Sequence, residues 1–499
     1  MDMDNSAIEL IVEDIWKKML NLEKIDSESN FFSVGGDSKK AISILSELKA
    51  QWSFISLPQI MKYHTIAEIS AYIKQHLDAS IDTINATEDD VSLLMNAIKQ
   101  LQDYSPSVEY SKNYDKYLIE SSNIQISRKE NYKNIFITGA TGFLGMHLVH
   151  EFLTSTNSDL YLLVRGKTPI ECKRRLEKIS DIYFPELKIT NKYSGRIHYI
   201  PGDITARQLG MNDEDYLALS DNIDCVIHSA ATVSHFDTWE KYQMININGT
   251  RNMLDFAAKI RKKDFCYIST ISIGFTEKQV QKKDLFSEYS TSFNSKSNVL
   301  YSMSKIETEK MVLDMQQQGL SVKIFRPGFL VQSFETGQFQ VNAEENALYK
   351  ALSILCKFGT VPDVQLPVID MTYVDQAAKA ISKLCGINDN HNIYHVFNPN
   401  RISISDLFRY YSEFTDGLRI CTVSAFEQIL RENAEKYKEE IFELSIMMML
   451  DTHVDPSVLC LSKNDRTVRC LETQGFVWEP VNKEFISNMV VVLNNIKNI

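Results

Sequence analysis

The sequence predicts an α/β protein, in which a small four-helix unit precedes a doubly wound parallel sheet and a smaller, helix-rich C-terminal lobe. From Tyr132 onward, β-rich runs such as NIFITG, LYLLVRG and CVIHSAA are separated by enough residues for a helix each. That alternation is typical of a parallel sheet covered on both faces. The first run leads into a glycine-rich turn at 139–145. Before residue 79, apolar residues recur at helical spacing.

The composition narrows the possible functions. A chain of 499 residues is too long for one ordinary core. A net charge of −12 gives no general attraction to nucleic acid. No apolar run approaches the about 20 residues of a membrane span, and the acidic start MDMDNSAIEL is unlike a signal peptide. The 8 cysteines show no paired spacing, so we expect reduced thiols, a cytoplasmic location and no metal site.

We expect four segments along the chain. Residues 1–78 form the helical unit, with 12 acidic and 8 basic residues and a capping box at Thr65 and Glu68. Residues 79–130 are polar and are interpreted as a linker containing one helical stretch. Residues 131–335 form the sheet domain. Residues 336–499 form the C-terminal lobe, with some return of the chain to the sheet domain.

A serine follows a double glycine in the helical unit, at Gly35-Gly36-Asp37-Ser38. The glycines permit a sharp turn, and Ser38 then stands at a helix start. On local grounds a helix cap is the simpler explanation. However, about 75 residues resemble the peptidyl carrier domains of nonribosomal peptide synthetases, through paired phenylalanines, GGDS, SKKAISILSEL and HTIAEISAYI. This resemblance implies that Ser38 carries 4′-phosphopantetheine. Lys39 departs from it, because the family usually has an apolar residue there.

The glycine turn at 139–145 predicts a dinucleotide site. It follows the strand NIFIT and opens the amphipathic helix MHLVHEFL. Gly139 suits a tight turn, Gly142 a close approach of backbone to pyrophosphate, and Gly145 close packing of helix on strand. We expect this segment to bind the cofactor through Gly139, Thr141, Gly142, Phe143, Leu144 and Gly145.

The end of the second strand favours NADPH over NADH. It carries Arg165 where an NAD site would place an acid, and a guanidinium suits a ribose 2′-phosphate. Arg175, in the cluster 173–175, is a second candidate, although such a cluster is also compatible with a solvated helix face. Further cofactor contacts are expected from Asp203, Ile204, Ser229, Ala230, Ala231 and Asn246, the last of which also suits a purely structural role.

Tyr301 and Lys305 lie four residues apart on one face of a predicted helix, and Thr270 ends an earlier strand. Together they resemble the Thr/Ser–Tyr–Lys set of extended short-chain dehydrogenases. In that set the lysine lowers the phenol pKa and binds the nicotinamide ribose, so both Tyr301 and Lys305 are also expected to contact the cofactor. The tyrosine donates a proton to the oxygen that gains charge, and Thr270 donates a hydrogen bond to that oxygen. Ser272 is a weaker substitute for Thr270.

The order GATGFLG, LLVRG, GDIT, HSAATV, NINGT, ISTISIG, YxxxK and RPG is similar to the terminal thioester reductase domains of peptide and polyketide synthetases, and to the reductase part of carboxylic acid reductases. The resemblance implies a Rossmann domain with a substrate lobe. It also implies NADPH-dependent release of a carrier-bound acyl or peptidyl thioester as an aldehyde, or as a primary alcohol after a second hydride. Upstream synthetase modules and a phosphopantetheinyl transferase are the implied partners.

Two alternative functions share parts of this pattern. A nucleotide-sugar epimerase or dehydratase would share the catalytic set, but it has no need of GGDS and would normally bind NAD. A redox-inactive relative that releases its cargo by cyclisation tends to lose the tyrosine that stands here as Tyr301. The intact pair of Tyr301 and Lys305 therefore favours the reductase.

Overall fold

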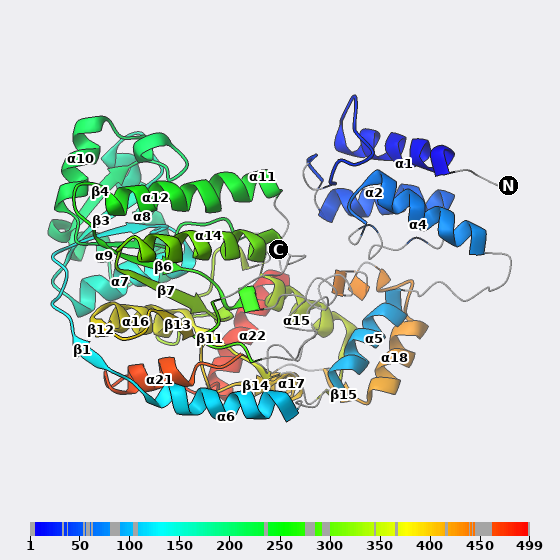
Figure 1. The fold of residues 1–499 in the computed structure, drawn as a ribbon. Helices are drawn as coiled ribbons and strands as arrows, with labels where there is room; N and C mark the ends of the chain where they lie inside the picture. Colours follow the sequence, from blue (N-terminus) through cyan, green and yellow to red (C-terminus); the bar gives the residue numbers. More distant parts are fainter. Residues whose placement is uncertain are drawn as a thin grey trace.

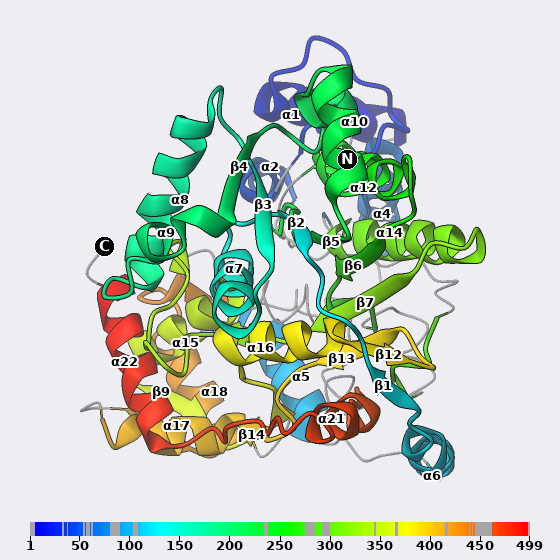
Figure 2. The same ribbon diagram turned by 90° about the vertical axis from the view of Figure 1, so that its left-hand side faces the viewer.

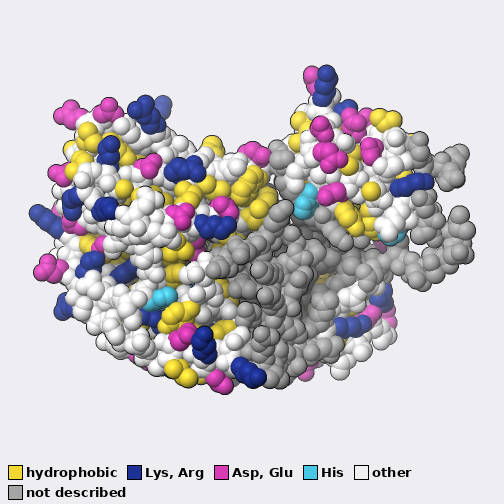
Figure 3. Space-filling view, viewed as in Figure 1, with side chains coloured by type: hydrophobic (Ala, Val, Ile, Leu, Met, Phe, Trp, Pro, Cys, Tyr) yellow, Lys and Arg dark blue, Asp and Glu magenta, His cyan; other side chains and the backbone are white. Residues whose placement is uncertain are grey.

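The computed structural model describes most of the chain. The described residues are 5–31, 34–36, 38–52, 55, 60, 63–79, 90–102, 108–233, 238–274, 285–291, 300–343, 346–364, 368–414, 418–438, 440–441, 443–444 and 462–497. Within them, no helix is both long and apolar enough to cross a membrane. On the face shown in Figure 3, acidic and basic side chains are mixed rather than gathered into one continuous patch.

The N-terminal unit is a small helical bundle. Its helices are α1 (Asn5–Leu20), α2 (Ser38–Gln51) and α4 (Ile66–Ala79), and they form a lobe of their own in Figure 1. Their apolar faces enclose a core that includes Trp16 and Phe31, whose rings meet edge to face at 5.0 Å. The fourth helix of the predicted bundle would fall between α2 and α4, largely outside the described residues.

The predicted capping box begins helix α4. The amide of Glu68 donates to Oγ1 of Thr65 at 3.1 Å, and the amide of Thr65 donates to Oε2 of Glu68 at 3.2 Å. The amide of His64 donates to the same carboxylate at 2.8 Å. Amides that α4 leaves without intrahelical acceptors are thereby satisfied, and the sequence prediction of this helix start is confirmed.

The predicted parallel sheet is present. Seven parallel strands lie in the order β13-β7-β6-β5-β2-β3-β4. The chain order reverses between β2 and β5, so the carboxyl ends of these two strands form the switch point at which such sheets bind ligands. The strands are β2 (Asn134–Thr138), β3 (Asp159–Val164), β4 (Ile197–Pro201), β5 (Cys225–His228), β6 (Asp264–Ile268), β7 (Val322–Pro327) and β13 (Ile393–Val396).

Helices cover both faces of the sheet, as Figure 2 shows. One apolar cluster joins the strands to α7 (Phe143–Ser155), α8 (Pro169–Tyr183) and α16 (Val374–Cys385). A second cluster joins them to α10 (Asp213–Asn222), α12 (Gly249–Ala258) and α14 (Leu300–Gln317). Shorter elements connect them: α9 (Ile189–Lys192), η1 (Ser194–Arg196), η2 (Arg207–Gly210), α11 (Trp239–Tyr242), the π-helix η3 (Gln243–Asn248) and η4 (Ile271–Gly274).

The C-terminal lobe packs a third apolar cluster that includes Tyr349, Tyr373 and Ile486. The chain returns from this lobe to the sheet domain as α16 and β13, as expected. The other elements of this part of the chain are β8 (Leu330–Val331), α15 (Ala347–Phe358), β9 (Thr360–Pro362), β10 (Val368–Ile369), β11 (Thr372–Tyr373), β12 (Ile387–Asp389), β14 (Ile402–Ser403), α17 (Ile404–Ser412), β15 (Arg419–Cys421), α18 (Val423–Glu432), α21 (Asp465–Glu472) and α22 (Lys483–Lys497).

Most of the described part of the expected linker 79–130 packs against elements from residues 336–499. Helix α5 (Asp90–Gln102) buries Leu94 and Ile98 in a cluster with Phe426 of α18. Helix α6 (Val108–Ser122) lies against α21. Strand β1 (Ile126–Arg128) pairs antiparallel with β12. Sequence polarity did not reveal this packing because each element packs against residues more than 150 positions away along the chain.

Candidate active site

The glycine turn lies at the carboxyl end of β2, and positions 139 and 145 within it have no room for a side chain. Gly139 has φ +76°, and a Cβ there would lie 2.7 Å from the backbone nitrogen of Ala230. A Cβ on Gly145 would lie 1.9 Å from the carbonyl oxygen of Gly139. Helix α7 begins at Phe143, and its N-cap Gly142 has no side chain that could cap it. The first amides of α7 therefore remain available to an anion at the switch point.

Two arginines meet beyond β3. Arg165 follows the strand and is exposed, and Nη1 of Arg175 lies 3.5 Å from its carbonyl oxygen. Thr168 caps α8 by accepting from the amide of Glu171 at 3.2 Å, which fixes this corner. Lys173 instead pairs with Glu177 along the helix at 3.7 Å. The structure thus brings Arg165 and Arg175 together and leaves Lys173 on a solvated face.

The loop after β4 is held by hydrogen bonds within the loop and by one from helix α12. Oδ1 of Asp203 accepts from the amide and the hydroxyl of Thr205, each at 2.8 Å. The carbonyl of Ile204 accepts from Nδ2 of Asn252 on α12 at 2.7 Å. The Ile204 side chain is buried against Gly249, where a Cβ would come within 2.7 Å of it. Asp203 and Ile204 therefore occupy a fixed turn next to the ends of the central strands.

A buried histidine supports the segment Ser229–Ala231 from below. Nδ1 of His228 lies 2.8 Å from Oγ1 of Thr138, which accepts from the amide of Ala230 at 3.2 Å. Nε2 of His228 lies 3.1 Å from Oγ1 of Thr250. Burial, and then the charge of Lys305, lowers the pKa of His228 to about 3. The ring is therefore neutral, and its supporting role was not evident from the local sequence.

Asn246 is buried in the π-helix η3 and is fully engaged. Its Oδ1 accepts from the amide of Thr232 at 2.9 Å, and its Nδ2 donates to the Thr232 carbonyl at 3.2 Å. Nδ2 also donates to Oγ of Ser304 on α14 at 2.9 Å. These bonds join the loop after β5 to the helix of the predicted catalytic pair. The arrangement suits a positioning role better than the direct cofactor contact expected from the sequence.

The three predicted catalytic residues meet at the carboxyl edge of the sheet. Thr270 follows β6, and the amide of Ser269 donates to the carbonyl of Phe325 on β7 at 2.7 Å. The phenol of Tyr301 lies close to Thr270, whose hydroxyl donates to Oγ of Ser272 at 3.1 Å, and the side chain of Tyr301 is 8% exposed. Burial raises the pKa of Tyr301 to about 12, and the nearby Thr270 side chain opposes that shift. Tyr301 is therefore a protonated phenol at neutral pH.

Lys305 lies one helical turn after Tyr301 and is buried. Its Nζ donates to the carbonyl of Ile268 at 2.9 Å and to the hydroxyl of Tyr267 at 3.3 Å. Burial lowers the pKa of Lys305 to about 7, and the carboxylate of Glu309 opposes the shift. Burial and the nearby Thr270 side chain are the causes that set the pKa of Tyr301. The expectation that Lys305 lowers the phenol pKa stays a prediction.

These features fit a dinucleotide. The open amides of α7, the close backbone approach at Gly139 and the two arginines offer a pyrophosphate and a 2′-phosphate the donors they need.

In the carrier unit, Ser38 is the first residue of α2. The preceding turn is tight, since Gly35 has φ +92° and a Cβ on Gly36 would lie 2.4 Å from the Phe31 carbonyl oxygen. Asp37 lies outside the described residues.

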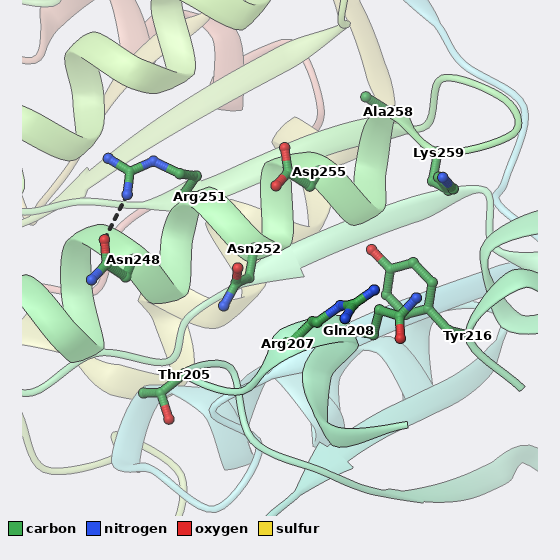
Figure 4. Close-up of a pocket in the computed structure, with 10 residues that line it drawn as sticks. All are labelled: Thr205, Arg207, Gln208, Tyr216, Asn248, Arg251, Asn252, Asp255, Ala258 and Lys259. Atoms are coloured by element: carbon green, nitrogen blue, oxygen red, sulfur yellow. Dashed lines mark hydrogen bonds between the residues drawn. The ribbon is translucent and has the colours of Figure 1, made fainter. Parts of the chain in front are cut away.

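A separate polar groove of about 680 Å³ lies on the outer face of α12 (Figure 4). Arg207 and Tyr216 form one wall, and Arg251 is held by Oδ1 of Asn248 at 2.6 Å. Thr270, Tyr301 and Lys305 do not line this groove. The described residues contain no cluster of side chains able to hold a metal.

The fold and this arrangement define an NAD(P)H-dependent oxidoreductase of the short-chain dehydrogenase type. Residues 137–381 match the family model described as "Male sterility protein", an NAD-binding family, and residues 11–73 match the one described as "Phosphopantetheine attachment site". A solved thiolation-reductase di-domain from an archaeal non-ribosomal peptide synthetase has a TM-score of 0.73 and 25% identity, over 98% of each chain. The chain is therefore similar, over nearly its whole length, to a phosphopantetheine carrier domain joined to a reductase domain.

Other relatives agree with this description. The terminal R domain of the myxalamid PKS-NRPS pathway has a TM-score of 0.62 and 27% identity, over 74% of this chain and 92% of that one. The L-2-aminoadipate reductase large subunit of Candida glabrata is 24% identical over 90% of this chain and 33% of its own length. The isonitrile lipopeptide synthase of Streptomyces coeruleorubidus is 22% identical over 97% and 32%. The chain thus spans about a third of the length of these two curated relatives.

Proposed function

We propose that the chain catalyses the NADPH-dependent reductive release of an acyl or peptidyl group held as a thioester on Ser38. The products are an aldehyde and the free carrier thiol, and a second hydride transfer would convert the aldehyde into a primary alcohol. The observation that carries the proposal is the buried phenol of Tyr301 close to Thr270 at the carboxyl edge of the sheet, in a chain that also matches a phosphopantetheine attachment domain.

The side chains support the reduction in the following way. Bound NADPH supplies the hydride, and the thioester carbonyl oxygen gains the negative charge. The phenol of Tyr301 donates a proton to that oxygen, and Thr270 is placed to stabilise it by a second hydrogen bond. Lys305, held by the carbonyl of Ile268, orients the cofactor ribose. When the carbon–sulfur bond breaks, the hydroxyl of the resulting thiohemiacetal returns its proton to Tyr301 as the carbonyl re-forms, and the sulfur leaves as thiolate and takes up a proton from solvent.

We propose NADPH rather than NADH because of the corner at Arg165. Arg165 follows the end of β3 and is exposed, and the Arg175 side chain donates to its backbone carbonyl at 3.5 Å, so both arginines stand at the corner where a 2′-phosphate is expected. The two cations would then bind a group that NADH lacks. In the proposed setting, a phosphopantetheinyl transferase loads Ser38, and upstream synthetase modules deliver the acyl or peptidyl group in a reducing cytoplasm. The described cysteines are all free thiols, in keeping with that compartment.

The two alternative functions fit the molecule less well. A nucleotide-sugar epimerase has no use for the phosphopantetheine attachment domain at 11–73. Release by cyclisation needs no proton donor at Tyr301, yet the phenol is present, buried and close to Thr270. A released product that carries an aldehyde or alcohol would exclude the second alternative directly.

The proposal can be tested with an acyl thioester of free pantetheine offered to the full chain. We expect oxidation of NADPH together with an aldehyde that can be trapped as its oxime. A Ser38→Ala variant should retain this reaction, because the free thioester bypasses the carrier. Absence of NADPH oxidation with a range of acyl chain lengths would overturn the proposal.

A further inference from the structure

The segment 285–291 lies between Thr270 and Tyr301 along the chain and touches the elements that hold both of them. Phe286 is fully buried in a cluster with Ile271 and Ile306. A Cβ on Gly274, at the end of η4, would lie 2.2 Å from the Phe286 ring. Ile271 follows Thr270 directly, and Ile306 is on α14. Phe286 thus packs against both the turn that follows Thr270 and the helix that carries Tyr301 and Lys305.

Two residues further on, the carboxylate of Glu288 is fully buried and has three donors. Its Oε1 accepts from the amide and the hydroxyl of Thr467, at 2.9 and 2.8 Å. Its Oε2 accepts from the hydroxyl of Tyr117 at 2.9 Å. Burial raises the pKa of Glu288, and these bonds oppose the shift. A buried carboxylate is stable only while such donors stay in place.

Tyr117 belongs to α6, in the segment that connects the carrier domain to the sheet domain. Its side chain is 2% exposed, and its hydroxyl also accepts from the amide of Arg466 at 3.2 Å. A second bond joins the same two segments, from the hydroxyl of Tyr289 to the carbonyl of Glu120 at 3.1 Å. Helix α6 therefore holds the segment 285–291 at two points.

The rest of the segment is tied to the sheet and to α14. Nε2 of His391 lies 3.0 Å from the carbonyl of Glu288. Nη2 of Arg326 donates to the carbonyl of Ser290 at 2.9 Å and to Oε2 of Glu309 on α14 at 2.7 Å. These contacts make the segment part of the support of α14, and Tyr117 supplies one of the two contacts that come from α6.

We propose that Tyr117 is a positioning residue for the reduction: through Glu288 and Phe286, it keeps the turn that carries Thr270 in place beside the helix that carries Tyr301. The inference rests on the proposed function. If the inference holds, helix α6 contributes to catalysis and does not only connect the carrier domain to the sheet domain. Loss of the Tyr117 hydroxyl removes the donor to Oε2 of Glu288 and the acceptor of the Arg466 amide. The segment then shifts, and Phe286 transmits the shift to the turn after Thr270.

The test compares Tyr117→Phe with Tyr114→Phe in the full chain, using the acyl thioester of free pantetheine. Tyr114 lies on the same helix, and its hydroxyl makes a long, partly buried bond to Asp465 at 3.4 Å. We expect Tyr117→Phe to lower kcat about tenfold, given the usual effect of leaving a buried acceptor unpaired. The Kd for NADPH and the KM for the thioester should stay within about twofold, and Tyr114→Phe should behave like the parent chain.

Two further measurements keep the inference falsifiable. Amide hydrogen exchange at 271–274 should become faster in Tyr117→Phe and not in Tyr114→Phe, which is measurable even if the parent chain oxidises no NADPH. If Tyr117→Phe does not fold, Tyr289→Phe should show the same two effects to a smaller degree, because it removes the second link to α6. Unchanged kcat and unchanged exchange in a folded Tyr117→Phe would overturn the inference, as would equal losses in Tyr114→Phe.

Discussion

Nδ2 of Asn246 lies 2.9 Å from Oγ of Ser304, the residue immediately before Lys305. The same amide group accepts from and donates to the backbone of Thr232. One buried side chain thus fixes the loop after β5 relative to the helix that carries Tyr301 and Lys305. This relationship explains why an asparagine occurs within the π-helix η3, where it would otherwise be a costly buried polar group.

Asn246→Ala should therefore damage catalysis and stability together. The substitution removes the bonds of Asn246 to the half-buried backbone of Thr232 and to Oγ of Ser304, and each such hydrogen bond typically contributes about 1 kcal/mol. We expect a lower urea midpoint and a kcat reduced by at least about tenfold. Asn246→Asp serves as the control that keeps the shape and the acceptor but loses the donor to Ser304. Parental stability in both variants would contradict the role assigned to this residue.

Tyr301→Phe should abolish turnover without loss of cofactor binding. The phenol proton is the one that the reduced oxygen takes up, and removal of a general acid typically costs about 100- to 10,000-fold in rate. Single-turnover absorbance measurements give the rate, and fluorescence titration gives the Kd for NADPH. A Tyr301→Phe chain that reduced the thioester at the parental rate would show that the proton comes from elsewhere.

The preference for NADPH should depend on Arg165. Replacement of Arg165 by Ala removes a cation beside the expected 2′-phosphate, so the Kd for NADPH should rise about tenfold or more while the Kd for NADH stays nearly constant. Lys173→Ala is the matched control, because Lys173 is already paired with Glu177 on the solvated face of α8. An equal rise in the Kd for NADPH and the Kd for NADH would contradict the role proposed for Arg165.

Asp370 should make stability fall as pH rises. Burial raises the pKa of Asp370 to about 7, its Oδ2 has no hydrogen-bond partner among the described residues, and a Cβ on Gly328 would lie 1.7 Å from that oxygen. Because the folded-state pKa exceeds the unfolded value near 3.8, the favourable contribution is complete below a pH of about 4 and is lost as the pH rises through about 7. Asp370→Asn should flatten this dependence and raise the denaturant midpoint at a pH of about 8. A parental slope in the variant would contradict the shift.

The sequence predicted those features that are encoded locally. The strand before Gly139, the constraint at Gly145 and the capping box at Thr65 each depend on a few adjacent residues, and the structure confirms all three. The spacing of Tyr301 and Lys305 likewise needs only one helix. Their proximity to Thr270 was expected from the resemblance to the Thr/Ser–Tyr–Lys set of extended short-chain dehydrogenases.

The features that the sequence did not reveal depend on distant partners. Tyr117 and Glu288 are 171 positions apart, and nothing in the polar stretch around Tyr117 indicates a buried bond. For Asn246 the sequence left open a cofactor contact and a purely structural role, and its bonds to Thr232 and Ser304 favour the second. In both cases the tertiary packing, and not the local motif, determines what the side chain does.

The central claim is tested most directly by a single turnover on the carrier itself. Ser38 is loaded with an acyl-pantetheine by a phosphopantetheinyl transferase, NADPH is added, and NADPH absorbance and the released product are followed together. We expect NADPH oxidation in step with loss of the acyl group from the carrier, release of an aldehyde or alcohol, and no reaction in Ser38→Ala. Release of a cyclised product or a carboxylic acid with no NADPH consumed would contradict it.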